Sequence, residues 1–293
     1  MQTSEPYFHF RLDSSDDHKI EVHRWQGGAA PRAVVQIAHG MGEHALRYRP
    51  LAEALVGAGC VVYASEHRGH GADAAAQDKL GDFGPRGFEA LADDMAVLSR
   101  HLRAQHPGLP LILFGHSMGS FATQCYLVEH SELLAGAALS GTTAVDLMLE
   151  AARAGFKLED MNAGVPDSRT PFDWLSRDPA QVDAYIADPL CGFTVTPASR
   201  ASMFAECTRL AEPDTLRRIR PGLPIYLFTG DRDPVNNHLA WFEPLVSRYR
   251  AAGQTDVSSH VFGGARHETL NETNRAEVIA IFAAWIGRVA SGR

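Results

Sequence analysis

Short apolar runs of strand length alternate with longer amphipathic stretches along this 293-residue chain, and this alternation constrains the fold most strongly. The runs are rich in β-branched residues and nearly uninterrupted, which is typical of strands buried on both faces of a mostly parallel sheet. They cover residues 33–38, 60–64, 110–114, 135–139, 224–228 and, less cleanly, 257–262. Between and after them the pattern predicts helices over 49–56, 88–105, 118–130, 238–252 and 274–289. This order predicts a doubly wound α/β sheet with right-handed crossovers.

Two segments depart from the alternation. Residues 7–12 and 19–25 alternate with a period of two, which predicts a hairpin of half-exposed strands ahead of the main sheet. Between residues 142 and 219 no convincing buried strand occurs, and six prolines punctuate short helical pieces. A structureless loop of that length is improbable in a compact domain. The sequence therefore predicts an α/β core made of residues 1–141 and 220–293, with residues 142–219 forming an inserted helical cap.

Composition excludes several classes of protein. A hydrophobic content of 45% without long polar tracts excludes disorder. A net charge of −8 and the lack of a Lys/Arg-dense stripe argue against a nucleic-acid partner. The apolar runs fall well short of the ~20 residues that a membrane span needs. The four cysteines are widely spaced, and no basic stretch followed by an apolar one begins the chain, so we expect free thiols and a cytoplasmic location.

The motif with the clearest chemistry is G-H-S-M-G at 115–119, which follows an apolar run and precedes an amphipathic helix. In this context G-x-S-x-G predicts a nucleophile elbow, a turn so tight that the serine takes a strained backbone conformation with its hydroxyl exposed. The glycines keep side chains from colliding across the turn, and the helix amides point at an oxyanion formed beside Ser117. We therefore predict Ser117 as a catalytic nucleophile.

A serine hydroxyl needs a base to take its proton, so the sequence is expected to supply an acid and a histidine in the order Ser, Asp, His. Asp231 and Asp233 follow the run that ends at Phe228, and His267 follows the last run. Both positions lie at the carboxyl edge of the predicted sheet, where catalytic groups of such sheets gather. We prefer Asp233, which lies further into its loop; Asp231 is expected to accept backbone hydrogen bonds in the turn.

An oxyanion hole needs a second amide besides that of Met118. The segment H-G-M-G-E-H at 39–44 follows the run 33–38, and its glycines allow the backbone to approach a substrate closely. The amide of Met41 is the predicted donor, and losing one such donor typically costs ~2.7–4 kcal/mol of transition-state stabilisation. In the same segment, Glu43 and Arg47 lie four residues apart at a helix start and are predicted to pair.

Four segments together resemble the monoacylglycerol lipase and lysophospholipase branch of the α/β-hydrolase superfamily. They are H-G-M-G-E-H-A-L-R-Y at 39–48, E-H-R-G-H-G at 66–71, the elbow at 115–119 and A-R-H-E at 265–268. The resemblance runs from about residue 30 to the C-terminus. Two positions depart from the family pattern: Ser120 stands where relatives commonly have glycine, and Glu66 stands where the family has aspartate.

The resemblance implies a catalytic triad of Ser117, Asp233 and His267, with oxyanion amides from Met41 and Met118. It also implies that residues 142–219 are the family's helical cap, which lines the acyl pocket. Together with the residue-level reading, this predicts a serine hydrolase that cleaves lipid-like carboxylic esters of monoacylglycerol or lysophospholipid type through an acyl-enzyme. The predicted partner is a small-molecule ester, and no metal or organic cofactor is required.

Several alternatives stay open at this point. A small-ester carboxylesterase or a serine peptidase would use the same fold and triad, and a non-catalytic binding protein could keep the fold alone. A metal-dependent hydrolase would use His67 and His70, although Gly69 and Gly71 favour a rigid loop there. Asp93 and Asp94 are interpreted as a solvated helix face. Transient membrane or micelle contact through the cap is a hypothesis for apolar residues Phe156, Leu158, Met161, Phe172, Trp174 and Leu175.

Overall fold

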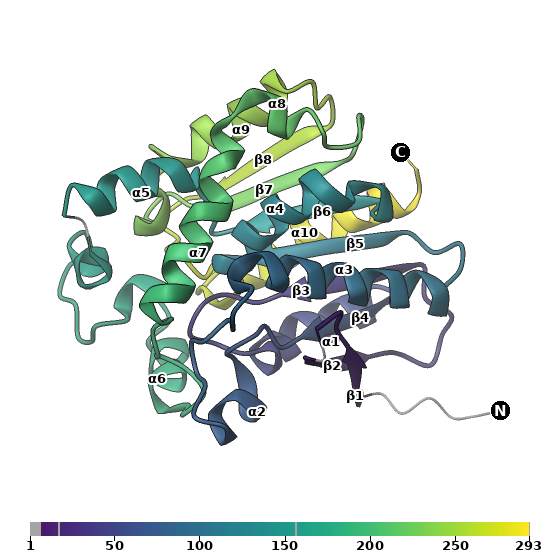
Figure 1. Cartoon of the computed structure of the whole chain (residues 1–293), viewed down its shortest axis with the longest axis horizontal. Helices are drawn as coiled ribbons and strands as arrows, with labels where there is room; N and C mark the ends of the chain where they lie inside the picture. Colours follow the sequence, from purple (N-terminus) through teal and green to yellow (C-terminus); the bar gives the residue numbers. More distant parts are fainter. Residues whose placement is uncertain (1–6, 17, 156, 293) are drawn as a thin grey trace.

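An eight-stranded sheet forms the centre of the molecule (Figure 1). The computed structural model describes residues 7–16, 18–155 and 157–292, apart from the side chains of residues 158 and 159. The strands are β1 (Tyr7–Asp13), β2 (Lys19–Trp25), β3 (Ala33–Ala38), β4 (Cys60–Ser65), β5 (Leu111–His116), β6 (Gly136–Ser140), β7 (Ile225–Gly230) and β8 (Val257–Phe262). All six predicted apolar runs form strands whose ends lie within two residues of the prediction.

The strand order is β1-β2-β4-β3-β5-β6-β7-β8. β1 and β2 form the predicted hairpin, β2 pairs antiparallel with β4, and every later pairing is parallel. In register, Ala38 of β3 lies opposite Gly115 of β5, and His116 lies opposite Ser140 of β6. The carboxyl ends of the central strands therefore meet at one edge, as the predicted α/β fold requires.

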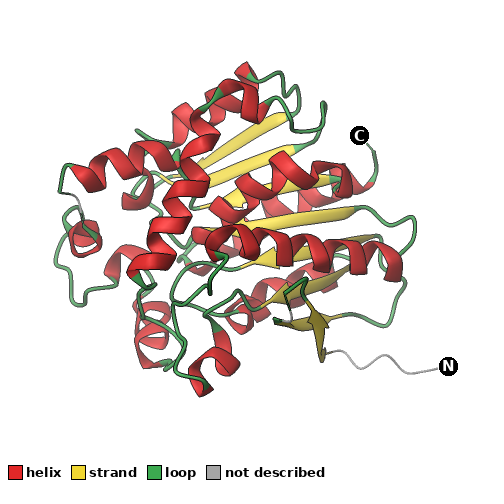
Figure 2. Cartoon of the chain, in the orientation of Figure 1, coloured by secondary structure: helices red, strands yellow, loops and turns green. Residues whose placement is uncertain are grey.

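Helices cover both faces of the sheet (Figure 2). On one face, α3 (Gly87–Gln105), α4 (Met118–His130) and α9 (Phe242–Ala251) bury apolar residues in one core cluster. On the other face, α1 (Arg49–Gly57) and α10 (Arg275–Ala290) form a second cluster, in which Phe282 packs on Phe114 and Phe228. The shorter elements of this core are η1 (Ala45–Tyr48), α2 (Gly71–Ala76), η2 (Ser131–Leu133), η6 (Pro234–Asn236) and η7 (Thr269–Asn271).

The chain between β6 and β7, which we call the β6–β7 segment, contains helices and no strand among its described residues. Its elements are α5 (Val145–Arg153), η3 (Leu158–Asn162), η4 (Asp173–Leu175), α6 (Pro179–Ala187), α7 (Pro197–Thr208), η5 (Arg209–Ala211) and α8 (Pro213–Leu216). Prolines open α6, α7 and α8, where a missing amide hydrogen costs nothing. α7 packs against α3, α4 and α5. In Figure 1, α5 and α6 lie at the left, beside the carboxyl ends of the strands, and α8 lies at the top.

Two local predictions differ from the structure. α9 begins at Phe242 rather than at residue 238, because Asn237, His238 and Leu239 take positive φ angles of 51°, 52° and 78°. Asp94 is buried rather than solvated: its carboxylate accepts hydrogen bonds from the hydroxyl of Ser14 and, at 2.7 Å, from Nε of Arg68. The pattern of α3 alone could not reveal a partner 26 residues away.

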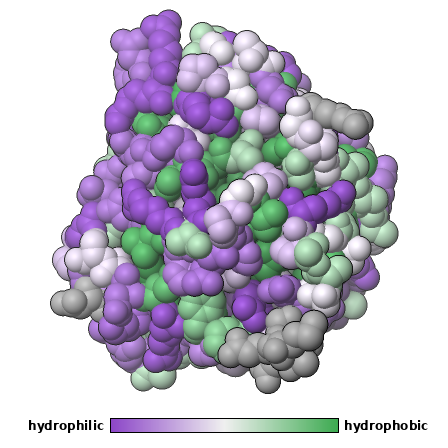
Figure 3. Space-filling model, turned by 90° about the vertical axis from the view of Figure 1, so that its right-hand side faces the viewer, coloured by the Kyte–Doolittle hydropathy of each residue, from purple (hydrophilic) through white to green (hydrophobic). Residues whose placement is uncertain are grey.

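One end of the molecule lies opposite the β6–β7 segment, at the right of Figure 1. Figure 3 views this end, and hydrophilic and hydrophobic residues are interspersed over it without one continuous apolar patch. None of the helices in the described ranges combines the length and hydropathy that a membrane span requires.

Candidate active site

Ser117 lies between the end of β5 and the start of α4. Its φ and ψ of 51° and −122° are rarely adopted by residues with a side chain, as expected of a nucleophile elbow. The surrounding backbone holds this conformation: the amide of Ser117 donates to the carbonyl of Ser140 at 2.9 Å. The carbonyl of Ser117 accepts from both the amide and the hydroxyl of Ser120, at 2.8 and 2.6 Å. The serine that replaces the family's glycine thus adds a bond that supports the turn.

The elbow requires glycine on both sides of Ser117. A Cβ on Gly115 would lie 2.4 Å from the carbonyl oxygen of Gly119, and a Cβ on Gly119 would lie 2.2 Å from that of Ala38 and 2.4 Å from that of His39. Real side chains do not approach backbone this closely. The glycines therefore let α4 approach the end of β3, and this contact brings Ser117 beside the loop at residues 39–44.

Asp233 and His267 are bonded to each other. Nδ1 of His267 lies 3.0 Å from both carboxylate oxygens of Asp233. Asp233 is fully buried, and its carboxylate also accepts from the amide of Val235 at 2.9 Å and from the hydroxyl of Thr229 at 3.0 Å. With these donors in place, the carboxylate is fixed in an orientation that faces the imidazole.

The neighbouring acid has a different partner. Asp231 accepts from the amide of Gly264 at 2.7 Å, which is the backbone role that the sequence indicated. A Cβ on Gly230 would lie 1.9 Å from the carbonyl oxygen of Ala265, so the loops after β7 and β8 approach this closely only because a glycine stands there. The structure brings Asp233, rather than Asp231, together with His267.

Two histidines lie side by side in the site and have opposite pKa shifts. Burial favours a neutral His267, but the charge of Asp233 and its hydrogen bond outweigh burial, and the net effect raises the pKa of His267. The ring of His116 lies 4.7 Å from that of His267, and burial together with the His267 charge lowers the pKa of His116 to about 4. His116 therefore stays neutral. The indole of Trp174, 5.1 Å from the His267 ring, covers the pair.

Ser117 and His267 line the same small cavity, although no hydrogen bond joins the hydroxyl to the imidazole in the described structure. Gly141, at the end of β6, makes room for the ring: a Cβ there would lie 2.8 Å from Cε1 of His267 and 2.9 Å from Cε1 of His116. Sequence reasoning missed Gly141. The sequence feature that could have identified Gly141 is its position at the carboxyl end of a predicted central strand, at the edge of the sheet where the site forms.

The two predicted oxyanion donors have unoccupied amides. Within the described ranges, neither Met41 nor Met118 donates its amide hydrogen to a protein acceptor. The amides on either side of Met41 are occupied, because those of Gly40 and Gly42 donate to side-chain acceptors at 2.5 and 3.3 Å. The arrangement can therefore offer two amide donors to an oxygen bound beside Ser117.

A buried ion network connects the loop at residues 39–44, which we call the oxyanion loop, with the loop that carries His267. Glu43 accepts from the amide of Gly40 at 2.5 Å and from the hydroxyl of Tyr48 at 2.7 Å. Arg47 pairs with Glu43 at 2.5 Å, as predicted, and also holds both oxygens of Glu268 at 2.7 and 2.8 Å. Sequence reasoning missed Glu268, which lies 221 residues from Arg47 in the chain. Because two carboxylates share one guanidinium, the network is net negative.

Ser117 lies where two cavities meet. The larger, about 480 Å³, is mostly apolar, and five of the chain's seven methionines line it: Met41, Met118, Met148, Met161 and Met203. The smaller, about 50 Å³, continues past Ser117 to His267, Tyr185 and Glu268 and has more ionisable residues in its wall than the larger one. Met41, Ser117, Trp174 and Thr194 belong to both walls. A ligand centred at Ser117 can therefore place an apolar group in the larger cavity and a polar group in the smaller one.

Four of the residues proposed from sequence for membrane contact have described side chains, and these four do not form an exposed patch. Met161, Trp174 and Leu175 are buried, and Phe172 is half-buried. Met161 and Trp174 line the larger cavity, and Phe172, Trp174 and Leu175 line the smaller one. Phe156 and the side chain of Leu158 lie outside the described residues. In this structure the side chains of Met161, Trp174 and Leu175 therefore face the site, and membrane contact through the cap stays a prediction.

The histidine loop at 66–71 is packed rather than open. Both nitrogens of His70 have backbone partners, the carbonyl of Arg68 at 2.9 Å and the amide of Gly42 at 3.3 Å. His67 is buried against the ring of His39, 4.4 Å between centroids. The carboxylate of Glu66 accepts from the amide of Ala45 at 3.2 Å, so the longer acid reaches the oxyanion loop. These contacts give the loop a structural role beneath the site.

A larger cavity, about 710 Å³, lies elsewhere and contains none of the residues predicted for the triad or the oxyanion hole. Charged side chains line it, including Arg11, Asp73, Asp16 and Arg68. They pair with one another, at 2.6 Å for Arg11 with Asp73 and for Arg68 with Asp16. Volume alone therefore does not locate the site; the convergence of Ser117, His267 and unoccupied amides does.

Comparisons with known proteins agree with this geometry. The chain matches the family described as serine aminopeptidase, S33, over residues 29–274. A monoacylglycerol lipase of Mycolicibacterium smegmatis is 31% identical over 267 residues, which cover 89% of this chain and 90% of that enzyme. Human monoglyceride lipase is 29% identical over 187 residues, 61% of this chain and 59% of its own. The solved structure of a thermostable carboxyl esterase from Bacillus coagulans, in complex with glycerol, has a TM-score of 0.87 and 27% identity and covers 98% of this chain and all of its own.

A parallel sheet of this order, with a strained serine where β5 turns into α4, defines an α/β-hydrolase. With these relatives, the protein is a carboxylic ester hydrolase by class. The chain belongs to the serine aminopeptidase, S33, family and, within it, to the branch that resembles monoacylglycerol lipases. The resemblance found in the sequence is thereby confirmed.

Proposed function

We propose that this protein hydrolyses carboxylic esters of monoacylglycerol or lysophospholipid type, with Ser117, Asp233 and His267 as its catalytic triad. The observation that carries the proposal is the position of Ser117 between a methionine-lined cavity of about 480 Å³ and a small one lined by histidine and glutamate side chains. An acyl chain suits the first and a small polar alcohol suits the second, and ligand pockets commonly have about 300–1,000 Å³. The names of the monoacylglycerol lipase and carboxyl esterase relatives support an ester of this kind.

In the proposed mechanism, His267 takes the proton of Ser117 as the hydroxyl attacks the ester carbonyl. Asp233 keeps the tautomer with its proton on Nδ1 and stabilises the imidazolium that forms. The amides of Met41 and Met118 donate to the tetrahedral oxyanion. His267 then protonates the departing alcohol, and water repeats the cycle on the acyl-enzyme. The raised pKa of His267 favours its role as a proton acceptor.

The β6–β7 segment is, in this proposal, a cap over residues 142–219, with the core made of residues 1–141 and 220–293. Support comes from the cavity wall, to which the segment supplies Met148, Met161, Trp174 and Met203. The cap therefore contributes much of the acyl-binding surface. A cytoplasmic location is also proposed, supported by four cysteines that are all free thiols.

Labelling with a fluorophosphonate tests the nucleophile directly. Wild-type protein should be labelled at one serine and should hydrolyse a soluble nitrophenyl ester, and Ser117→Ala should lose both while keeping its circular dichroism. Ser168→Ala is a matched control, because this exposed serine of the β6–β7 segment lines neither cavity. Labelling that persists in Ser117→Ala would contradict the assignment, and unlabelled wild-type protein would favour a non-catalytic binding protein.

A substrate series tests the acyl preference. Monoacylglycerols and nitrophenyl esters of increasing chain length should show falling KM as the acyl chain fills the apolar cavity, whereas an aminoacyl amide should be a poor substrate. The amide is included because the family description names an aminopeptidase. Met203→Gln, which places an amide in the wall, should raise KM for long esters and leave acetate esters unchanged. Faster cleavage of the amide, or a preference for acetate, would favour the peptidase or the small-ester esterase.

A further inference from the structure

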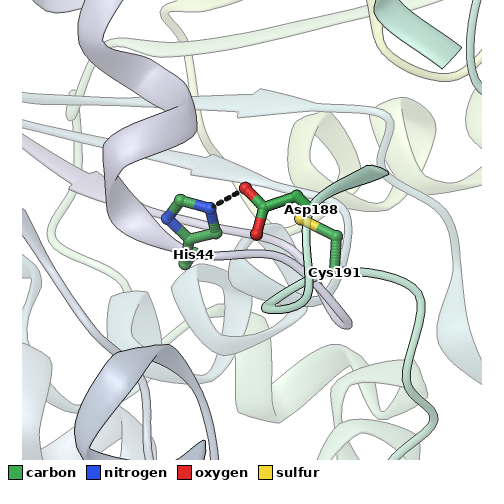
Figure 4. Close-up of side chains that lie close together, drawn as sticks. All are labelled: His44, Asp188 and Cys191. Carbon is green, nitrogen blue, oxygen red and sulfur yellow. Dashed lines mark hydrogen bonds and ion pairs between the residues drawn. The ribbon is translucent and has the colours of Figure 1, made fainter. Parts of the chain in front are cut away.

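A histidine, an aspartate and a cysteine meet where the loop at residues 39–44 contacts the β6–β7 segment. His44, Asp188 and Cys191 each offer one ligand atom, and these atoms all lie within 4.8 Å of one another (Figure 4). Among the described residues, this is the one group of three His, Cys, Asp or Glu side chains with such spacing. None of the three belongs to the proposed triad or donates to the oxyanion.

A short turn presents the aspartate and the cysteine to the histidine. The amide of Cys191 donates to the carbonyl of Asp188 at 3.0 Å, and one carboxylate oxygen of Asp188 accepts from the amide of Leu190 at 2.8 Å. The other oxygen faces His44, whose Nε2 lies 2.9 Å away. Figure 4 shows the carboxylate and the sulfur on the side of the turn that faces the imidazole. Two ligands of different chemistry are thus held together before any ion binds.

The imidazole is buried and has one partner only. His44 is 7% exposed, and its Nδ1 has no hydrogen-bond partner within the described residues. The contact of Nε2 with Asp188 alone therefore orients the ring. Asp188 and Cys191 are partly exposed, so an ion can reach the group from solvent.

We propose that His44, Asp188 and Cys191 form a binding site for a zinc-like divalent cation that links the core to the β6–β7 segment. One nitrogen, one oxygen and one sulfur are ligands that zinc accepts, and a site with three protein ligands leaves a fourth position for water. Tetrahedral bonds of 2.0–2.3 Å separate ligand atoms by about 3.3–3.6 Å. The present separations, from 2.9 Å to at most 4.8 Å, bracket that value. Magnesium and calcium, which take oxygen ligands, are excluded by this donor set.

Binding requires one proton to leave. A free cysteine thiol carries its proton at neutral pH, and only the thiolate is a metal ligand. The cation takes the thiolate, and the thiol proton passes to solvent. Nε2 of the neutral imidazole binds the ion, and the ring proton is then on Nδ1.

The ion would reinforce an existing junction. The carbonyl of Gly42 already accepts from the hydroxyl of Tyr185 at 2.8 Å and from the amide of Gly192 at 2.9 Å. Both donors flank the turn that carries Asp188 and Cys191, and Gly42 follows the proposed oxyanion donor Met41. A bound cation therefore ties the oxyanion loop to the proposed cap and should slow turnover by restraining cap opening. This consequence rests on the proposed function, whereas the binding itself does not.

A cobalt titration of the full chain tests the binding. Cobalt(II) should bind one ion per chain and give the near-ultraviolet charge-transfer band of a thiolate ligand, and zinc should displace it with release of one proton. Cys191→Ser should lose the band, and Asp188→Asn should bind at least 10-fold more weakly. Cys125→Ala is the matched control, because this buried thiol lies in α4 beside Cys207, away from the proposed site. The charge-transfer band of this variant should match that of the wild type. No band in the wild type, or an unchanged band in Cys191→Ser with folding confirmed by circular dichroism, would overturn the site.

Activity provides a second and separable readout. With a soluble nitrophenyl ester, kcat should fall as zinc saturates the site, with half-inhibition at the dissociation constant from the cobalt competition. The kcat of Cys191→Ser should not change when zinc is added at that concentration. An unchanged kcat at full occupancy would overturn the link to cap opening. An enzyme inactive on every ester without metal would contradict the proposed function and leave the cobalt result standing.

Discussion

At the scale of single residues, surroundings rather than residue type decide the role. Asp231 and Asp233 lie two positions apart, yet one holds a backbone amide and the other holds the imidazole of His267. His116 and His267 touch, yet burial lowers the pKa of His116, whereas the charge and hydrogen bond of Asp233 outweigh burial and raise that of His267. The site thus contains one histidine that can take up a proton near neutral pH and one that cannot.

This contrast predicts a pH profile. Hydrolysis needs a neutral His267, so kcat/KM should rise with pH through the raised pKa of that residue. Asp233→Asn removes the negative charge that raises the pKa of His267, so the inflection of the profile should move to lower pH. The activity of this variant should fall by about 10⁴-fold. A pH series of kcat/KM on a soluble ester measures both. Asp231→Asn, which keeps an acceptor for Gly264, should retain the wild-type inflection, and the opposite ranking of the two variants would refute the choice of acid.

The buried network around Arg47 gives a prediction about stability. Arg47→Ala leaves Glu43 and Glu268 buried without their shared cation, so the free energy of unfolding should fall by about 3–5 kcal/mol. Arg217→Ala breaks an ion pair with Asp214 in which both side chains are mostly exposed. This variant should change the free energy of unfolding by less than about 1 kcal/mol. Urea unfolding compares the two. Equal losses would show that the network does not act as a buried unit.

At the scale of secondary structure, the elbow depends on how closely α4 approaches β3. Gly119→Ala would place a methyl group 2.2 Å from the carbonyl oxygen of Ala38, so the helix must shift away and Ser117 with it. We expect loss of ester hydrolysis and a lower thermal midpoint. Gly57→Ala is the matched control: its Cβ would meet nothing within 4 Å at the end of α1, and helix propensity favours alanine by up to about 1 kcal/mol. A Gly119→Ala variant with wild-type turnover would contradict this account.

The elements themselves were largely predictable from sequence, because each depends on local pattern. Continuous β-branched runs indicated β3 to β8, and the strand before G-x-S-x-G and the helix after it located Ser117. Contacts across the chain were not predictable in this way. The bonds of Arg47 to Glu268 and of Asp94 to Arg68, and the space that Gly141 leaves for His267, depend on how distant segments pack. The start of α9 was missed because three residues in the left-handed region delay it.

At the scale of the whole molecule, buried histidines link the fold to pH. Burial lowers the pKa of His67, His70 and His116, to about 3 for His70 and about 4 for His116. The unfolded chain binds these protons near pH 6.5, whereas the folded chain does not. The stabilising contribution of each histidine is therefore complete above pH 6.5 and is lost as the pH falls toward the folded pKa. The protein should be markedly less stable in mild acid than at neutral pH.

Urea unfolding at pH 7.5 and pH 5 measures this effect. Below pH 6.5 each histidine should remove about 1.4 kcal/mol per pH unit from the free energy of unfolding. His70→Gln should reduce the slope of the free energy of unfolding against pH by the contribution of one proton, even if the variant is less stable at every pH. The same midpoint at both pH values, or an unchanged slope in the variant, would mean that these histidines do not remain neutral in the folded chain.

The methionine lining of the large cavity has a consequence in redox chemistry. Thioethers are flexible and polarisable, so a wall built from five of them adapts to chains of different shape. Peroxide converts each thioether to a polar sulfoxide, which no longer suits an apolar chain. Oxidative damage should therefore appear first as a loss of long-chain substrates while acetate esters are still cleaved, and methionine sulfoxide reductases should restore the original preference. In the proposed function, the pocket for the acyl chain is therefore also the place where methionine oxidation would change the substrate preference.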